Sequence, residues 1–316
     1  MSDATVPAQR LMLLDSASLY FRAFFGLPET ITAPDGTPVN AVRGLLDFIA
    51  KLVIDYQPTH LIACWDDDWR PQWRVDLIPT YKTHRVAVEV EVLPDVEVVP
   101  DPLSVQVPII IKVLAAFGIP VVGAAHHEAD DVIGTLATGA PMPVDVVTGD
   151  RDLFQLIDDR ADVRVIYTGR GMSNLEVLTD ATLTAKYSVS AAQYADFAAM
   201  RGDTSDGLPG VAGVGEKTAA TLLASYGNLD GIVAAAADPE SALSASLRAK
   251  LLAASAYLEV APTVVEVVRT LELPEVDSRI EPLPADRVEL VQFLAATWGL
   301  GDAAKRALRA LGNEVA

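Results

Sequence analysis

The sequence predicts an α/β protein with a central, mostly parallel sheet flanked by helices, followed by a helical region. Short apolar segments, typical of buried strands, alternate with helical patterns in the first half of the chain. Several of these segments end in acidic residues, and beyond about residue 180 the pattern is almost wholly helical. Strands that alternate with helices imply a parallel sheet with helices on both faces.

Four apolar segments are the expected strands, with the letters LMLLD, HLIACWD, GIPVVGA and VDVVTGDRD. The first ends at Asp15, the second at Asp66, and the fourth at Asp150 and Asp152. The expected helices among them are 39–56, 105–117 and 129–137. Because ligands gather at the carboxyl ends of parallel strands, we expect these acids to converge on one edge of the sheet.

The second half of the chain is predicted to form a smaller helical subdomain. Helical patterns cover 182–187, 191–200, 217–226, 243–258 and 286–298. We therefore expect two units, residues 1–198 and residues 199–316. One biased segment, 86–107, is rich in Val and Pro and contains acids but no Lys or Arg. Its letters VEVEV suit either an alternating strand or a mobile excursion.

Composition limits the class of protein. The 316 residues are 51% hydrophobic, which is enough for a large core, and Cys64 is the only cysteine, which excludes an internal disulfide. The chain has no visible secretory signal and no apolar run of membrane length, so we expect a cytoplasmic location. The net charge of −19 argues against a nucleic-acid ligand unless positive charge is local or supplied by bound metal.

The segment HHEADDVIGTL, residues 126–136, places three carboxylates within four positions at the start of a helical pattern. Acids in the first turn of a helix can simply complement its dipole and cap it. The alternative is a metal site, because crowded carboxylates repel one another unless a cation lies between them. Mg²⁺ and Mn²⁺ prefer carboxylate and water oxygens, and two such ions ~3.5–4 Å apart can promote phosphodiester cleavage. The candidate acids are Asp15, Asp66, Glu128, Asp130, Asp131, Asp150, Asp152, Asp203 and Asp206.

A glycine-rich segment, RGDTSDGLPGVAGVGEKTAATLL, covers residues 201–223 and leads into a helix that begins near Glu216. Its letters GVGEKT resemble a phosphate-binding loop of nucleoside triphosphatases, but Glu216 stands where that motif needs Lys. A glycine turn between two helices that grips a nucleic-acid backbone suits the segment better. A plain connection between two helices is the alternative.

Five motifs occur in the order and spacing of the bacterial 5′ nuclease family. They are LLDSASLYFRAFF, YKTHR, HEADDVIGTLA, TGDRDLFQL and RGDTSDGLPGVAGVGEKTA, within residues 11–230. The chain therefore resembles stand-alone 5′-3′ exonucleases and the N-terminal domain of DNA polymerase I. The resemblance implies a PIN-like fold, a helical arch within 79–108, and a helix–three-turn–helix near 200–226 that holds duplex DNA and often a potassium ion.

The resemblance also implies roles for individual residues. Asp15, Asp66, Glu128 and Asp130 match the ligands of a first metal ion. Asp131, Asp150, Asp152, Asp203 and Asp206 match the acids that serve a second. The matched cations are Lys82 and Arg85 at the base of the arch, and Arg22 and Arg74 at phosphate contacts, although each could also be a surface cation in a weak salt bridge.

The remaining implied contacts concern DNA. Tyr20 matches a position that stacks on an unpaired base, whereas Phe21 is expected in the core. Residues expected to hold the duplex are Gly210, Gly213, Gly215, Lys217 and Thr218. His126 and His127 are expected to be structural or exposed rather than metal ligands.

Two segments depart from the family pattern. Asp67 and Asp68 lengthen the step after Asp66, and the acidic segment 86–99 looks like an insertion in the arch that would repel a DNA strand. The function that we expect is two-metal-ion hydrolysis of DNA at 5′ ends, nicks and 5′ flaps during replication and repair. RNA–DNA primers as substrates, and a polymerase and a ligase as partners, are further expectations. The alternatives are a catalytically silent protein that binds DNA structures and a PIN-type ribonuclease.

Overall fold

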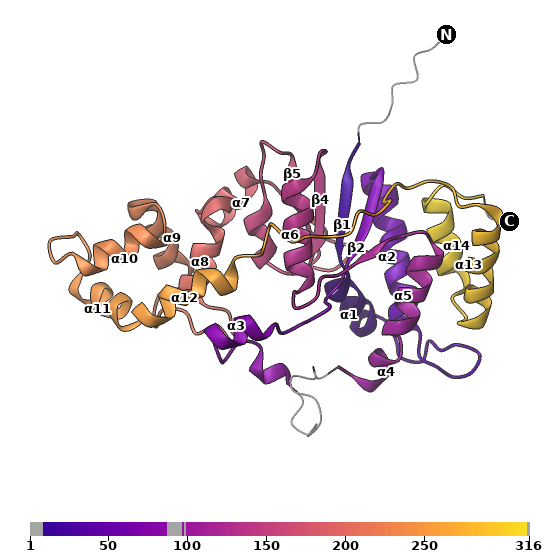
Figure 1. Cartoon of the computed structure of the whole chain (residues 1–316), viewed down its shortest axis with the longest axis horizontal. Helices are drawn as coiled ribbons and strands as arrows, with labels where there is room; N and C mark the ends of the chain where they lie inside the picture. Colours follow the sequence, from indigo (N-terminus) through magenta and orange to yellow (C-terminus); the bar gives the residue numbers. More distant parts are fainter. Residues whose placement is uncertain (1–8, 87–96, 98, 315–316) are drawn as a thin grey trace, which may run out of the picture.

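The computed structural model describes residues 9–86, 97 and 99–314, and its centre is a six-stranded sheet between two helical layers (Figure 1). The strand order is β3-β2-β1-β4-β5-β6. All neighbours pair in parallel except β5 and β6. The strands are β1 Leu11–Asp15, β2 His60–Cys64, β3 Val121–Val122, β4 Val144–Thr148, β5 Val163–Tyr167 and β6 Glu176–Leu178. The predicted mostly parallel α/β sheet is therefore confirmed.

The central strand β1 is buried on both faces, which explains its uninterrupted apolar sequence. Leu11 and Leu13 belong to the hydrophobic core on one face of the sheet. Met12 and Leu14 belong to the core on the other face. Successive side chains of a strand point to opposite faces, so one short strand supplies both cores.

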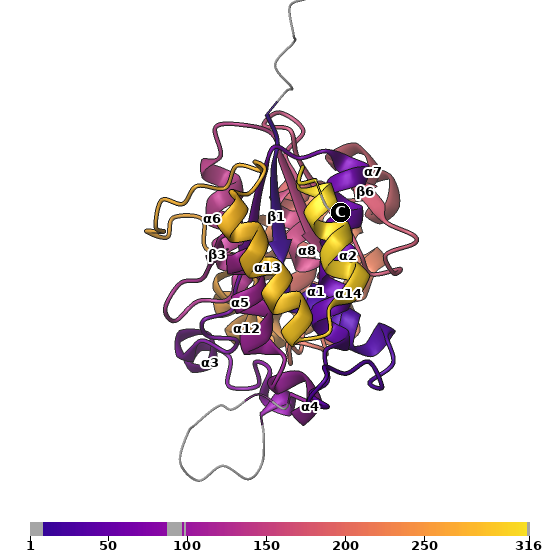
Figure 2. The ribbon, with the colours of Figure 1, turned by 90° about the vertical axis from the view of Figure 1, so that its right-hand side faces the viewer.

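The helices α1, α2, α5, α13 and α14 contribute to the core that contains Met12 and Leu14. Their bounds are Ser16–Gly26, Asn40–Tyr56, Val107–Ala116, Ala285–Thr297 and Gly301–Ala310. Figure 2 shows α13 and α14 lying in front of the sheet, where α14 packs on α2 and α13 packs on α5. The last two helices of the region 199–316 therefore pack on α2 and α5 of the sheet domain, and the division of the chain between residues 198 and 199 stays a prediction. Their small buried residues, such as Ala303 and Ala307, fit closely against α2.

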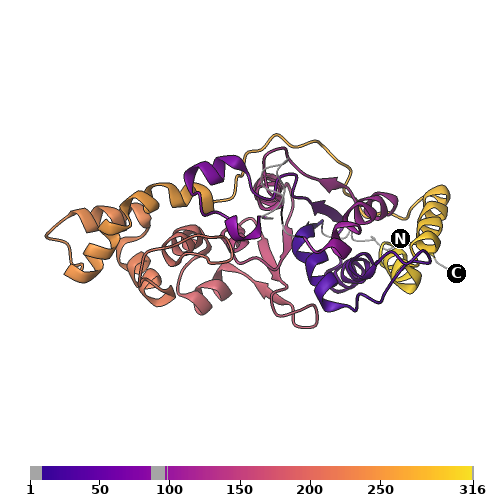
Figure 3. The same cartoon turned by 90° about the horizontal axis from the view of Figure 1, so that it is seen from below.

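The other helices lie on the opposite face or extend beyond it (Figure 3). They are α6 Ala129–Gly139, α7 Asp180–Tyr187, α8 Tyr194–Arg201, α9 Glu216–Tyr226, α10 Leu229–Ala237, α11 Ala245–Ala253 and α12 Ser255–Val265, with the 3-10 helices η2 Asp152–Leu156 and η3 Ala191–Gln193. The expected helix 243–258 is two helices, because the chain bends at Ala254. From α12 an extended segment, 266–284, returns along the sheet to α13, and the amide of Leu61 donates to Ser278.

The expected arch region begins with α3 Gln72–Leu77 and η1 Thr83–Arg85 and ends with α4 Asp101–Ser104. Val86 and Glu97 form an antiparallel bridge that closes its base. Residues 87–96 and 98 lie outside the described residues, so the arch remains an expectation from the sequence. None of the described helices is both long and apolar enough to cross a membrane.

Candidate active site

The carboxyl ends of β1 and β4 lie at the point where the strand order reverses direction, the usual place of ligands in open α/β sheets. Asp15 ends β1, and Asp150 follows β4 by two residues. Asp66 follows β2, and Asp130 stands in the first turn of α6. These four acids line one cavity of about 240 Å³. The predicted convergence is confirmed for them.

Asp15 is fixed by contacts with both neighbouring elements. One carboxylate oxygen accepts a hydrogen bond from the amide of Ser18 at 3.1 Å, so Asp15 caps α1. The other accepts from the hydroxyl of Thr148, the last residue of β4, at 2.6 Å. Burial, assisted by the nearby charge of Asp66, raises the pKa of Asp15 to about 7. The folded protein therefore disfavours the charge of Asp15 at neutral pH.

The other three acids of the cavity are perturbed in the same direction. Burial raises the pKa of Asp66, which accepts from the amide of Ala129 at 2.7 Å and so ties β2 to the start of α6. Burial and the charges of Asp150 and Asp15 raise the pKa of Asp130 well above its ordinary value. Burial, followed by the charge of Asp206, raises the pKa of Asp150. The cavity therefore favours a nearby positive charge.

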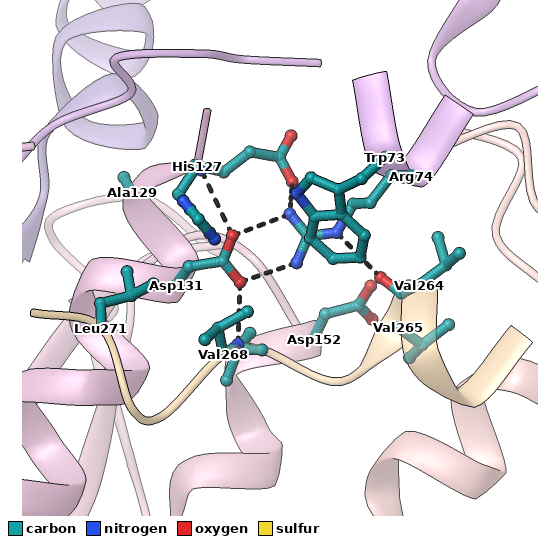
Figure 4. Close-up of polar contacts among 12 residues, drawn as sticks. Trp73, Arg74, His127, Ala129, Asp131, Asp152, Val264, Val265, Val268 and Leu271 are labelled. Carbon is teal, nitrogen blue, oxygen red and sulfur yellow. Dashed lines mark hydrogen bonds and ion pairs between the residues drawn. The ribbon is translucent and has the colours of Figure 1, made fainter. Parts of the chain in front are cut away.

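Glu128 and Asp131 lie in a buried ionic network beside this cavity (Figure 4). The guanidinium of Arg74 contacts Glu128 and donates to both oxygens of Asp131, at 2.7 and 3.0 Å. Glu128 also accepts from the Tyr81 hydroxyl at 2.7 Å and from the Lys82 ammonium. Together Glu128 and Asp131 form the capping box of α6, so the capping interpretation holds for these two acids.

Arg74 is only 2% exposed, and its Nε donates to the carbonyl of Val264. Asp131 is fully buried, and the amide of Val268 donates a further hydrogen bond to its carboxylate. Figure 4 shows the network joining α6 to α3 and to the end of α12. Both side chains are engaged within the protein, and the phosphate contact expected for Arg74 and the metal-serving role expected for Asp131 stay predictions.

A second group of acids follows β4 and α8. Asp152 is buried, and one of its carboxylate oxygens has no hydrogen-bond partner among the described residues. Burial and the charges of Asp150, Asp206 and Asp203 raise the pKa of Asp152 well above its ordinary value. Asp203 accepts from the amide of Ser205 at 2.7 Å. These acids lie near Asp150 but do not line the 240 Å³ cavity.

Lys82 and Arg85 both line the cavity, as the sequence predicted for cations at this position. Lys82 contacts Glu128, and Arg85 donates to Asp206 at 2.9 Å. The backbone also joins these segments, because the Lys82 amide donates to the Asp206 carbonyl at 2.9 Å. Gly207 makes this approach possible: a Cβ there would lie 2.0 Å from the carbonyl oxygen of Thr80.

The other residues singled out from the sequence lie at the margin of the cavity or away from it. Arg22 lines a neighbouring cavity instead. Tyr20 is half-buried, with its ring centroid 5.2 Å from Phe21 and 5.6 Å from Trp65. Its expected stacking on an unpaired base stays a prediction. Neither His126 nor His127 lines the cavity.

The glycine-rich segment connects α8 to α9, as expected for a helix–turn–helix arrangement. Gly210 and Gly213 have φ values of 63° and 71°, which favour glycine. Gly215 caps α9, so the first amides of this helix, at Lys217 and Thr218, belong to its N-terminal turn. Whether these residues touch DNA remains a prediction.

Sequence reasoning missed three contributors to the site. Thr148 orients Asp15, the Tyr81 hydroxyl donates to Glu128, and Glu97 lines the cavity. Thr148 is an ordinary strand residue by its pattern, and Tyr81 is the first residue of the YKTHR motif, in which the cations Lys82 and Arg85 were the candidates. Glu97 lies in the acidic segment that was interpreted as repelling DNA. Burial raises the pKa of Glu97 as well.

A parallel sheet with acids at its switch point, followed by a glycine-linked helix pair, is an arrangement that suits a nuclease. Two family models identify the family of nucleases. The family model described as 5′-3′ exonuclease, N-terminal resolvase-like domain, matches residues 10–188. The model described as 5′-3′ exonuclease, C-terminal SAM fold, matches residues 189–287. The chain belongs to the 5′-3′ exonuclease family and is a nuclease.

Curated relatives agree with this assignment. A 5′-3′ exonuclease of Streptomyces coelicolor is 57% identical over 95% of this chain and 99% of its own length. One from Mycobacterium tuberculosis is 52% identical over 95% and 97%. DNA polymerase I of Mycobacterium bovis is 40% identical over 88% of this chain but only 29% of its own length.

Solved structures of low identity show the same fold. A structure of T5 5′-exonuclease with bound zinc has a TM-score of 0.63 and 19% identity, and the match covers 96% of this chain and all of that one. The catalytic core of Rad2 in complex with a DNA substrate has a TM-score of 0.60 and 17% identity, over 96% of this chain and 93% of that one.

Proposed function

We propose that this nuclease hydrolyses DNA phosphodiester bonds at 5′ ends, nicks and 5′ flaps, with two divalent cations held at the carboxyl ends of β1 and β4. The observation that carries the proposal is the meeting of Asp15, Asp66, Asp130 and Asp150 in one cavity. The related fold of T5 5′-exonuclease holds divalent metal, and that of Rad2 holds DNA, which supports both parts of the proposal.

The donor set fits Mg²⁺ or Mn²⁺. The cavity offers carboxylate oxygens, the hard ligands that these ions prefer. Over residues 9–86, 97 and 99–314, no three His, Cys, Asp or Glu side chains form a ready-made cage. Mg²⁺ usually keeps several waters and binds through one or two carboxylates, so an open cavity of about 240 Å³ suits it. The unpartnered oxygen of Asp152 provides a further donor nearby.

Bound divalent cations would supply an activated water and charge stabilisation for the leaving oxygen. The chain's own residues position the reaction. Asp15, held by Ser18 and Thr148, keeps its carboxylate at the end of β1. Lys82 and Arg85 line the same cavity, where they can neutralise the scissile phosphate. The downstream product would carry a 5′-phosphate.

The glycine-linked pair α8 and α9 is proposed to hold the duplex. Backbone amides at the start of α9, with the positive end of its dipole, suit a phosphate of the DNA backbone. Gly210, Gly213 and Gly215 allow close approach, and Lys217 and Thr218 lie in the first turn. We place the potassium ion that the resemblance implies at this turn. Local cations and bound metal then offset the net charge of −19 where DNA binds.

RNA–DNA primers are included as proposed substrates, and a polymerase and a ligase as proposed partners. In DNA polymerase I of Mycobacterium bovis the matching region makes up 29% of a longer protein. That arrangement supports a role for this nuclease beside DNA synthesis. Cleavage of nick, flap and blunt duplexes, with DNA or RNA 5′ ends and with Mg²⁺, Mn²⁺ or chelator, tests the substrate range. No cleavage of any of these with either ion would overturn the proposed function.

Lys82→Ala is expected to slow single-turnover cleavage by about 10²–10³-fold at saturating DNA, because charge stabilisation of the transition state is lost. The exposed Lys51, which pairs with Asp55 on α2, provides the control variant Lys51→Ala. Since Lys82 also contacts the buried Glu128, the unfolding midpoint is measured in parallel. An unchanged single-turnover rate in a folded Lys82→Ala protein would exclude the assigned role.

The stabilising effect of Mg²⁺ is expected to grow as the pH rises. The pKa of Asp15 lies above its unfolded value of 3.8, so the folded state gains from the proton at low pH and loses this gain as the pH rises through about 7. A bound cation removes the repulsion. Mg²⁺ should therefore raise Tm more at about pH 8 than at about pH 5.5. In Asp15→Asn the difference between the two Tm shifts should be smaller. Equal shifts at both pH values would contradict the assignment of Asp15.

A further inference from the structure

Glu216, the first residue of α9, stands where a phosphate-binding loop of nucleoside triphosphatases needs Lys. A free carboxylate at this place would repel the DNA phosphate that the first amides of α9 are proposed to hold. The surroundings of Glu216 remove this conflict. Its carboxylate accepts a hydrogen bond from the guanidinium of Arg151 at 2.8 Å, and the guanidinium of Arg201 lies 3.6 Å away. The charge of Glu216 is therefore engaged by two cations of the protein.

Arg151 connects this helix to the acids that follow β4. In the sequence it lies between Asp150 and Asp152, so its backbone belongs to the turn that carries both carboxylates. Its partner Glu216 belongs to α9, 65 residues further along the chain. One ion pair thus joins the acids of the proposed reaction centre to the helix that is proposed to hold the duplex.

The side chain of Arg151 is held in place by aromatic residues. Its Nε donates to the Tyr194 hydroxyl at 3.4 Å, and its guanidinium carbon lies 5.0 Å from the centroid of the Tyr187 ring. Tyr194 is fully buried, and its ring packs against Phe154 with the centroids 5.3 Å apart. Because these contacts already orient the guanidinium, it loses little freedom when it binds Glu216, and the pair can define a distance.

Stability alone does not account for the Arg151–Glu216 pair. The two side chains are 32% and 51% exposed, and an ion pair that water reaches contributes little to the free energy of unfolding. The hydrogen bond from Arg151 lowers the pKa of Glu216, in agreement with a formed pair. The helix α9 is anchored by apolar residues such as Leu222 and Leu223. The pair therefore adds little to folding but restricts where the start of α9 lies.

We propose that the Arg151–Glu216 pair sets the distance between the duplex held by α9 and the acids that follow β4, and so determines which phosphodiester bond is cleaved. Both residues act by positioning, because neither lines the cavity that contains Asp15 and Asp150. A displacement of about 1 Å between a held substrate and its catalytic groups can cost about 10²-fold in rate. The inference rests on the proposed function, since it requires that α9 holds the duplex.

The test is the position of cleavage in a 5′-flap duplex with Mg²⁺, with product lengths resolved to one nucleotide. Arg151→Ala and Glu216→Ala should each produce new cuts at neighbouring bonds and slow single-turnover cleavage by about 10- to 100-fold. The double variant should behave like either single variant, because both substitutions remove the same contact. Binding of the uncleaved flap in EDTA should keep the salt dependence of the wild type, since no phosphate contact is lost.

Lys186→Ala is the matched control. Lys186 also pairs with a carboxylate, that of Glu176 at 2.9 Å, and its ammonium lies 5.4 Å from the centroid of the same Tyr187 ring. Its partner belongs to β6, however, and not to α9. The control should cleave the same bond as the wild type and at the same rate.

Three results for the variants would overturn the inference. The first is cleavage of only the wild-type bond by Arg151→Ala, and the second is additive losses of rate in the double variant. The third is a salt slope of flap binding that falls by about 0.9 in Arg151→Ala, which would assign Arg151 a phosphate contact instead. Failure of the wild-type protein to cleave with Mg²⁺ would overturn the proposed function itself.

Discussion

Asp150→Asn is expected to reduce Mg²⁺-dependent cleavage of a 5′ flap by at least about 10³-fold. Asp150 follows β4, lines the cavity beside Asp130 and Asp15, and has its pKa raised by burial and then by the charge of Asp206. An amide at this position keeps the shape of the side chain but removes the charge that would hold a cation. Asp130→Asn should have the same effect. Single-turnover cleavage measures the loss.

The same substitution is expected to leave the fold intact and to stabilise it in chelator. Removing a carboxylate from a crowded, buried group relieves both desolvation and repulsion. Asp286→Asn, on the exposed first turn of α13, is the control and should change neither cleavage nor stability. Full activity of Asp150→Asn and Asp130→Asn would remove the two-ion mechanism. Lower stability of Asp150→Asn in chelator would show that its carboxylate has a structural role instead.

Arg74→Ala is expected to lower the free energy of unfolding by about 3–5 kcal/mol. The guanidinium is the buried partner of both Glu128 and Asp131, and it also donates to the Val264 carbonyl. Its removal leaves two buried carboxylates short of a partner and loosens the contact between α6 and α12. Arg74→Lys should recover only part of the loss, since an ammonium cannot make the paired contacts with Asp131.

Denaturant unfolding at constant pH measures this effect. Arg279→Ala is the matched control, because Arg279 pairs with Asp277 on the surface and a pair of that kind contributes little. A change in the free energy of unfolding below about 1 kcal/mol for Arg74→Ala would contradict a stabilising role for the buried network around Arg74 and Asp131 (Figure 4). Weaker cleavage by a folded Arg74→Ala protein would be an indirect effect, through the start of α6.

The sequence predicted the parts of the molecule that local pattern controls. Strands 11–15 and 144–148 are short apolar runs, and acids that follow such strands meet wherever the sheet is parallel. The meeting of the acids follows from the period of the pattern and the direction of the strands alone. The places of Lys82 and Arg85, which line the same cavity, were implied by the resemblance of the YKTHR motif to the family.

The remaining features depend on contacts between distant residues, which no local pattern contains. The resemblance implied a phosphate contact for Arg74. Its partners in the fold, Asp131 and Val264, lie far along the chain, so no local pattern could show that they bind its guanidinium. The return of α13 and α14 to α2 depends on the course of the extended segment 266–284.

The most direct test of the central claim is a crystal structure of the protein with flap DNA and Mn²⁺, with the metal located by its anomalous scattering. We expect two peaks ~3.5–4 Å apart in the cavity between Asp15, Asp66, Asp130 and Asp150. A well-ordered complex in which DNA is bound but these four carboxylates hold no manganese would contradict the account.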